Sequence, residues 1–441
     1  MLSKLSLLFW CLWMISTGVA NAADSGLLIE NVTLIDGTGK TPLAKAWILV
    51  KGERIAAVSS QPQTVADSVR RLDGTGKYLI PGIIDSHIHL PGGRTGAGNR
   101  QMVMDPETGV KFLHGYLYSG VTSIYDSGNH GKYIEKMRAD ERAGKIVSPR
   151  IFATISLIAP LDGHGCCAGG IPVTSYSDAV EKLDALLQLK PDLLKFTRET
   201  RGMGLQARNM PLLPEDLFRK LIRYANERGV RTTVHVSNQS LARQAIEAGA
   251  SAFAHLPYLD KIDSHFANLV AVRGIPISTT ITRNEAAVAF YKEPAFAALL
   301  TPEELEAALH SERHVGTPRA AWMRTLRPIM FHNIRELYRA GAILALGTDR
   351  THGAMPHQEL KLLVEAGIPP LEALRIGTLN AAIYIGVDKE LGSIEVGKLA
   401  DMVLLTKDPT KNIGNTTAIE AVFKGGRQID RSQLNVVANR S

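Results

Sequence analysis

Hydrophobic and polar positions change rhythm twice along the chain. Residues 27–36 (LLIENVTLID) and 46–58 (AWILVKGERIAAV) alternate apolar and polar side chains on either side of a Gly-containing turn, which is typical of short antiparallel strands. The same alternation returns near the other end, in 399–406 (LADMVLLT) and 421–429 (AVFKGGRQI). We therefore expect the two chain ends to build one small β-sandwich domain around the middle of the sequence.

The middle of the chain alternates short β-rich runs with helical stretches. Segments such as 177–189 and 214–229 carry apolar residues at spacings of three and four, which predicts amphipathic helices. Strands that alternate with helices favour parallel pairing, and eight of them over about 310 residues predict an α/β fold, a (β/α)₈ barrel of the TIM type. The eight β-rich runs are 79–85, 121–126, 150–155, 192–197, 231–236, 251–256, 276–281 and 342–349.

The first 22 residues are expected to be absent from the mature protein. They carry Lys4, an apolar run from Leu5 to Trp13, and Ala20-Asn21-Ala22 before Ala23, a pattern typical of a cleavable secretory signal. A membrane anchor is the alternative, but the run is shorter than the roughly 20 residues that a spanning helix needs. We expect an exported protein, periplasmic or secreted, without a stable membrane anchor.

These patterns predict four segments and say little about partners. The segments are a signal peptide at 1–22, the β domain at 23–79 and 390–441, and the barrel at 80–389. Basic residues are scattered, and removing Lys4 lowers the net charge only from +7 to +6, so nucleic acid is not expected as a partner. The sequence leaves the oligomeric state open, and a homo-oligomer is one option.

Two neighbouring cysteines, Cys166 and Cys167, remain after the signal is removed. Adjacent Cα atoms lie about 3.8 Å apart, which is below the usual disulfide span of about 4.4–6.8 Å. A disulfide between them would be strained, and two free thiols in a loop are the simpler expectation.

Candidate chemistry gathers where the barrel strands end, which is where such barrels place their active sites. A single histidine there is more often structural than catalytic, but a group of them is informative. Four imidazoles and one carboxylate at one rim suit zinc or a similar divalent ion. The residues at these strand ends are His87 and His89 (first), Lys195 (fourth), His235 (fifth), His255 (sixth) and Asp349 (eighth).

Lys195 does not fit a metal site in its ordinary form, because an ammonium group has three donors and no acceptor. The order His-x-His, Lys, His, His, Asp over eight strands resembles the binuclear class of the amidohydrolase superfamily. Within it, the chain is similar to imidazolonepropionase-like proteins and to Xaa-Pro or Xaa-Arg dipeptidases. The similarity extends to the closing segment 392–405 (GSIEVGKLADMVLL).

The resemblance implies two divalent metal ions, with zinc as the default, and a lysine carboxylated by carbon dioxide. It also implies that a metal-bridging hydroxide attacks the substrate and that Asp349 moves the proton to the leaving amine. A mononuclear site beside an unmodified lysine is the alternative. Carried over by position, the first metal is expected at His87, His89 and Asp349, the second at His235 and His255, and carboxylated Lys195 between them.

The expected substrate is a small molecule or peptide with an amide bond, such as a dipeptide or an N-acyl or aryl-amide amino acid. Candidate substrate contacts are His164, between two glycines after the third strand, Arg198 as a carboxylate partner, and Tyr125 at the end of the second strand. Peptidase-like relatives often place a tyrosine shortly after the fifth-strand histidine, and this chain does not. Cyclic amides, lactones, phosphotriesters, deamination at one metal, and a non-enzymatic binding protein are the alternatives.

Overall fold

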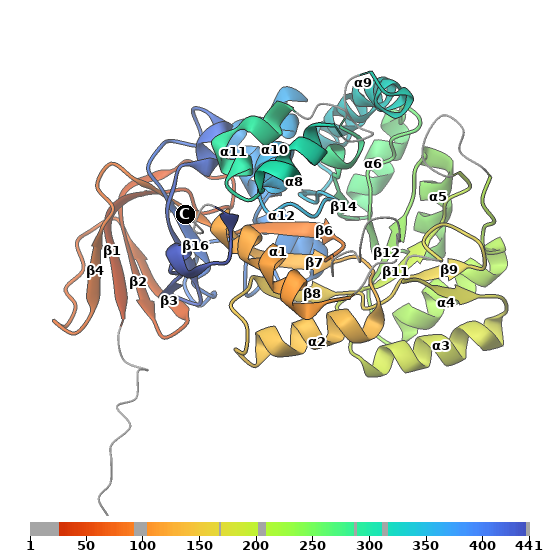
Figure 1. Cartoon of the computed structure of the whole chain (residues 1–441), viewed down its shortest axis with the longest axis horizontal. Helices are drawn as coiled ribbons and strands as arrows, with labels where there is room; N and C mark the ends of the chain where they lie inside the picture. Colours follow the sequence, from red (N-terminus) through yellow and green to blue (C-terminus); the bar gives the residue numbers. More distant parts are fainter. Residues whose placement is uncertain are drawn as a thin grey trace, which may run out of the picture.

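The computed structural model describes residues 26–91, 104–166, 169–201, 209–285, 289–310 and 316–437. The predicted signal at 1–22 and Cys167 lie outside these ranges, so export and the state of the cysteine pair stay predictions. Among the described residues, no helix is long and apolar enough to cross a membrane. A β-sheet unit lies at one end of the molecule, beside a larger part made of parallel strands and helices (Figure 1).

Each of the β-rich runs predicted in the middle of the chain contains a parallel strand. The first three pair with one another, and the other five pair in sequence order in a second sheet. Backbone hydrogen bonds link the two sheets at both sides, from Asp192 N to Ala153 O and from Ser86 N to Leu346 O, each 2.9 Å long. The strands are β6 (Ile83–Ile88), β7 (Val121–Asp126), β8 (Arg150–Ala153), β11 (Leu194–Thr197), β12 (Thr232–His235), β13 (Ala252–Phe253), β14 (Ile277–Ser278) and β15 (Leu344–Ala345).

Helices follow most of these strands and cover them (Figure 1). In α4, the buried residues Phe218, Leu221, Ile222 and Ala225 recur at helical spacing, which gives this helix its apolar face. The helices are α1 (Pro106–Tyr118), α2 (Gly131–Arg142), α3 (Tyr176–Gln188), α4 (Glu215–Glu227), α5 (Gln239–Ala248), α6 (Ser264–Val272), α7 (Pro294–Ala297), α8 (Pro302–Leu309), α9 (Pro318–Arg339), α10 (Met355–Glu365), α11 (Pro370–Ile376) and α12 (Leu379–Ile385). The short 3₁₀ helix η2 (Ile281–Asn284) follows β14.

Two short strands after β8 were not predicted from the sequence. These strands, β9 (Ile158–Pro160) and β10 (Ile171–Val173), pair in parallel, and β9 also pairs with β11. Each is three residues long and contains a proline, so neither shows the alternation that marks a strand in sequence. Together they frame the segment that carries His164.

The β-sheet unit combines strands from both parts of the chain. Its order is β18-β17-β16-β5-β1-β2-β3, with β4 paired to β1. Strand β16 pairs with β5 in antiparallel register, Met402 opposite Pro81. That this sheet folds into a sandwich stays a prediction. The strands are β1 (Leu27–Leu34), β2 (Leu43–Lys51), β3 (Arg54–Ser59), β4 (Arg70–Asp73), β5 (Tyr78–Pro81), β16 (Met402–Leu405), β17 (Ile419–Lys424) and β18 (Arg427–Gln428).

The run predicted as the first barrel strand is in fact divided at Gly82. Residues before it belong to β5 in the β-sheet unit, and residues after it begin β6. A Cβ atom on Gly82 would lie 2.0 Å from Thr122 Oγ1, so only glycine allows this close passage. The Gly82 amide donates to Asp401 O at 2.9 Å. The apolar run continues across two elements, which is why the sequence pattern alone did not reveal the break.

A partly buried ion pair joins the two parts of the molecule. Arg150 at the start of β8 donates through Nε and Nη2 to the two carboxylate oxygens of Asp401, at 2.9 and 3.0 Å. Asp401 also accepts from the Gly425 amide at 2.7 Å. Because Asp401 precedes β16, this bidentate contact fixes the β-sheet unit against the amino-terminal end of the parallel strands.

Candidate active site

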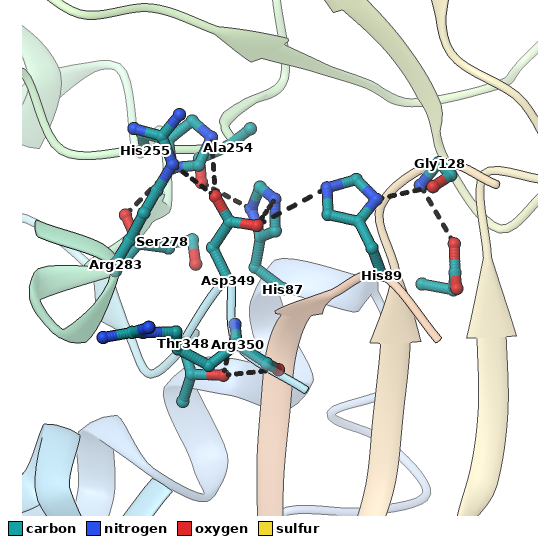
Figure 2. A network of polar contacts seen from close by, with 12 residues as sticks. His87, His89, Gly128, Ala254, His255, Ser278, Arg283, Thr348, Asp349 and Arg350 are labelled. Carbon is teal, nitrogen blue, oxygen red and sulfur yellow. Dashed lines mark hydrogen bonds and ion pairs between the residues drawn. The ribbon is translucent and has the colours of Figure 1, made fainter. Parts of the chain in front are cut away.

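Two histidines and an aspartate meet at the carboxyl end of the parallel strands. His87 lies in β6, His89 just beyond it, and Asp349 follows β15 by four residues. The Nε2 atoms of His87 and His89 lie 3.9 and 3.6 Å from Asp349 Oδ1. Their ligand atoms all lie within 4.8 Å of one another (Figure 2). Small rearrangement of side chains would bring all three to the bond lengths of about 2.0–2.2 Å that a shared zinc ion requires.

Hydrogen bonds at Nδ1 aim three imidazoles at this point. His87 and His89 each approach a backbone carbonyl oxygen through Nδ1, at 2.7 and 2.5 Å (Figure 2). His255 Nδ1 lies 2.9 Å from Thr280 Oγ1, and its Nε2 lies 4.0 Å from Asp349 Oδ2. A carbonyl can only accept, so the proton of His87 and of His89 is on Nδ1 and the Nε2 lone pair faces the site. This is the usual arrangement of histidines that bind metal.

Burial keeps His87, His235 and His255 in the neutral form that binds metal. Burial lowers the pKa of His87 well below its usual value, and the nearby Lys195 lowers it further. The pKa values of His235 and His255 are also well below the usual range, mainly because of burial. The rings of His235 and His255 lie 4.4 Å apart between centroids, so a second group of imidazoles adjoins the first.

His164 stacks on His235, with ring centroids 4.1 Å apart and an interplanar angle of 30°. Burial lowers its pKa to about 2, and the adjacent His235 contributes. His164 is therefore neutral and lies next to the second group of imidazoles. The loop predicted to bring it near the site does so.

Hydrogen bonds hold Asp349 in an uncommon backbone conformation. Its φ is +48°, in the left-handed region that residues other than glycine seldom adopt. The buried carboxyl of Asp85 accepts from Thr348 N and Thr348 Oγ1, at 3.0 and 2.7 Å, and Asp349 N donates to His87 O at 2.8 Å. These contacts fix the turn after β15 against β6. Strained residues of this kind are common at functional sites.

Lys195 lies beside the first histidine. Its Nζ donates to His87 Nε2 at 3.2 Å, and the side chain is buried on β11. Burial lowers the pKa of Lys195 from 10.5 to about 8. The amine therefore loses its proton far more easily than a lysine at the surface.

The structure adds Arg283, which the sequence did not reveal. Arg283 is buried on η2, and its Nε lies 2.5 Å from Asp349 Oδ2 (Figure 2). The buried carboxyl of Glu359 on α10 holds η2 in place, accepting from Thr279 Oγ1 at 2.6 Å and from the amides of Ile281 and Thr282 at 2.8 Å. Sequence reasoning had no signal for Arg283, because a lone arginine after a strand is usually a surface residue.

A cavity of about 350 Å³ opens over these groups. Most of the residues predicted for the site line this cavity. Arg283 of η2 and Arg319 of α9 line it as well. Its lining consists of His89, Leu90, Gly128, Asn129, His130, Leu157, His164, Gly165, Lys195, Thr197, His235, His255, Arg283, Arg319 and Asp349.

Arg198 and Tyr125, predicted as substrate contacts, are not among the residues that line this cavity. Arg198 Nε donates to Gln244 Oε1 at 2.7 Å, and its guanidinium lies over the ring of Phe218. Tyr125 is buried against Tyr384, with ring centroids 6.1 Å apart. The side chains of both residues pack around the strands and do not enter the cavity. The position of a residue at the end of a strand does not by itself predict the direction of its side chain.

The family model described as "Amidohydrolase family" matches residues 78–429 of the chain. This range covers most of the sequence and contains every residue of the site described above. The chain belongs to the amidohydrolase family.

Individual relatives of this amidohydrolase are distant. Ochratoxinase of Aspergillus niger is 24% identical over 435 residues, which cover 89% of this chain and 84% of that protein. Imidazolonepropionase of Alkaliphilus metalliredigens is 21% identical over 415 residues, or 87% of this chain and 90% of that protein. The crystal structure of a Xaa-Pro dipeptidase with bound methionine has a TM-score of 0.75 at 22% identity and covers 92% of this chain and all of that one, so the fold is shared.

Family membership makes the chain a metal-dependent hydrolase of amide or related carbon–nitrogen bonds, with a TIM-type scaffold of mixed α/β content. The residues present fit a divalent ion. Hydrogen bonds at Nδ1 orient the Nε2 atoms of His87 and His89 toward the site, and Asp349 adds a carboxylate. Nitrogen and oxygen donors in this combination suit zinc, and also manganese, cobalt or nickel.

Proposed function

We propose that this amidohydrolase is an exported enzyme that cleaves an amide bond adjacent to a carboxylate, in a dipeptide or an N-acyl or aryl-amide amino acid. The observation that carries the proposal is the position of Asp349. Its Oδ1 faces His87 and His89, its Oδ2 is held by Arg283, and the residue lines the cavity.

Two metal positions follow from the donors. His87, His89 and Asp349 would hold one ion, His235 and His255 the other, and Lys195 would join them as a carbamate. In support, a lysine with a pKa of about 8 has about a tenth of its amine uncharged at pH 7, and only the uncharged amine reacts with carbon dioxide. When bound, the two ions activate a water and polarise the substrate carbonyl.

Asp349 supplies the proton transfer. As a carboxylate at the cavity wall, it can accept a proton from the attacking water and deliver it to the nitrogen of the leaving amine. Arg283 fixes the orientation of the carboxylate for this transfer. The neutral His164 at the same wall is placed to donate a hydrogen bond to the substrate carbonyl oxygen, which would stabilise its developing charge.

The cavity wall offers cations for a substrate carboxylate. Arg283 and Arg319 line it, and a guanidinium group recognises carboxylates through paired donors. These arginines take the place that the sequence assigned to Arg198. Similarity to ochratoxinase and to a Xaa-Pro dipeptidase supports amide substrates of this class.

A substrate panel tests this function. Purified mature protein would be assayed on dipeptides, N-acyl amino acids, lactones and aryl phosphotriesters, and each amide would be tested as the free acid and as its methyl ester. We expect amide hydrolysis, with kcat/KM at least about tenfold higher for the free acid, which corresponds to one charge-assisted hydrogen bond. Hydrolysis of lactones or phosphotriesters alone, ammonia from aminated heterocycles, or equal rates for acid and ester would contradict the proposal.

A further inference from the structure

Glu199, in the loop directly after β11, presents a buried carboxylate oxygen to one of the site histidines. Its side chain is almost fully buried, and Oε1 accepts from the Arg201 amide at 3.0 Å. The other oxygen, Oε2, lies 3.5 Å from His235 Nε2. Within the described residues, neither Glu199 Oε2 nor His235 Nε2 has a hydrogen-bond partner. A buried polar atom without a hydrogen bond carries a desolvation cost. A hydrogen bond from His235 Nε2 to Glu199 Oε2 would remove this cost for both atoms.

His235 is oriented differently from the other site histidines. In His87, His89 and His255, Nδ1 contacts an oxygen and Nε2 faces Asp349. In His235, Nε2 is enclosed beside Glu199, while the ring lines the cavity. The two nitrogens of an imidazole point in nearly opposite directions, so Nδ1 of His235 lies on the cavity side.

We propose that Glu199 is a positioning residue that accepts the Nε2 proton of His235 and thereby leaves the Nδ1 lone pair free for the second metal ion. This inference rests on the proposed function. The ring nitrogen that carries the proton is decided by the hydrogen bond it makes, and carboxylates are common partners of metal-binding histidines. Nothing in the metal-ligand pattern of the sequence marks Glu199, which is four residues beyond Lys195.

The separation of 3.5 Å is a few tenths of an ångström longer than an ordinary N–H···O hydrogen bond. Catalytic hydrogen bonds are often long in the free protein and shorten when the site is filled. Stacking of His164 on the face of the His235 ring limits rotation out of its plane, so a small movement of the Glu199 side chain closes the contact.

Cobalt titration of the metal-stripped mature protein tests the role of Glu199. The variant Glu199→Leu keeps the size of the side chain but removes the acceptor, and we expect the dissociation constant of the second Co²⁺ to rise by about 10- to 100-fold. The first ion should bind as in the wild type. Glu199→Gln retains an oxygen acceptor and should give an intermediate value. Equal affinity for the second ion in wild type and Glu199→Leu would overturn the inference.

Asp192→Asn is the matched control. Asp192 is a largely buried carboxylate at the other end of the same strand, where it accepts from Arg138 Nη1 at 3.1 Å and Ala153 N at 2.8 Å. Its loss should lower stability and leave the affinities of both Co²⁺ ions unchanged. A lower affinity for the second Co²⁺ in this control would mean that the stability of the strand, and not the Glu199 contact, governs the binding of that ion. Wild-type protein that binds no Co²⁺ would refute the proposed function itself.

Nitrogen NMR of the wild type tests the contact between Glu199 and His235 directly, and it does not depend on whether the Glu199 variants fold. In zinc-loaded protein labelled with ¹⁵N-histidine, the His235 resonances, assigned by comparison with His235→Asn, should show a protonated Nε2 and a metal-bound Nδ1. His87 and His89 should show the reverse. A metal-bound Nε2 in His235 would overturn the inference, because Glu199 would then face the ion and not a ring proton.

Discussion

Asp349 presents its two carboxylate oxygens to different partners. Oδ1 lies 3.6 Å from His89 Nε2, and Oδ2 lies 2.5 Å from Arg283 Nε. The side that faces the histidines suits metal binding, and the arginine prevents the other side from rotating. This division of partners suits the double role that we propose for Asp349, as metal ligand and proton carrier.

Asp349→Asn should lower kcat/KM by about 10²- to 10⁴-fold on a carboxylate-bearing amide, the range that general acid–base catalysis contributes. The amide keeps the shape of the side chain but cannot accept the proton. Steady-state kinetics measures the change, with Asp178→Asn as a control, since Asp178 pairs with Lys182 on the surface of α3. Undiminished turnover in Asp349→Asn would remove Asp349 from the mechanism.

Lys195 should make the metal-free protein more stable at alkaline pH. Its pKa is about 8 in the folded protein against 10.5 as a free side chain, so the unfolded chain binds more protons between these values and stability rises with pH there. The gain is on the order of 3 kcal/mol. Denaturant unfolding at pH 7 and pH 10 should show this rise in wild type and a smaller one in Lys195→Met. Parallel profiles for the two proteins would show that Lys195 is not a buried, neutral amine.

Residue types alone located part of this site. Histidines, a lysine and an aspartate at the ends of predicted strands are rare enough to be noticed, and the structure places them around one cavity. Arg283 and Glu199 are common residue types in loops. Their importance comes from burial and from the atoms they face, and neither can be read from one sequence.

At the scale of elements, the site depends on how closely β6 and β15 approach each other. The turn after β15 begins at Gly347, where a Cβ atom would lie 2.0 Å from Ser278 Oγ and 2.8 Å from His87 Cβ. The alternation of strands and helices predicted this arrangement. Strands β13, β14 and β15 are only two residues long, however, and they keep their positions through pairing with neighbours more than through their own sequence.

Gly347→Ala should displace His87 and weaken the first metal position. Overpacking of this kind costs about 1–3 kcal/mol of stability, and we expect bound metal and kcat/KM to fall together. Gly115→Ala in α1 is the control, because its Cβ would meet only Leu299 at 3.6 Å and alanine favours the helix. Full metal binding and activity in Gly347→Ala would show that the approach of the two strands tolerates an added methyl group.

At the scale of the whole molecule, the β-sheet unit supports the parallel strands from the end opposite to the cavity. The β-sheet unit contacts the parallel strands through the ion pair between Arg150 and Asp401 and through the hydrogen bond from the Gly82 amide to Asp401 O. The sequence predicted strands at both chain ends from their alternation. It could not predict where the first barrel strand begins, since the apolar run continues through the junction.

Asp401→Asn should lower the free energy of unfolding by about 1.5–3 kcal/mol, the usual contribution of hydrogen bonds to a charged group. It should leave kcat/KM nearly unchanged, because the pair is remote from the cavity residues. Glu390→Gln, which breaks the half-exposed pair with Arg54, should cost less than about 1 kcal/mol. Equal losses in the two variants, measured by denaturant unfolding, would show that the junction adds no particular stability.

The number of metal ions per chain tests most directly whether Lys195 joins two metal ions in this site. Elemental analysis would be done on mature protein purified without chelator, beside the Lys195→Ala variant. We expect two divalent ions in the wild type, falling to one or none in the variant. A single ion that Lys195→Ala leaves in place would contradict the two-metal site, because Lys195 would then be structural and the site mononuclear.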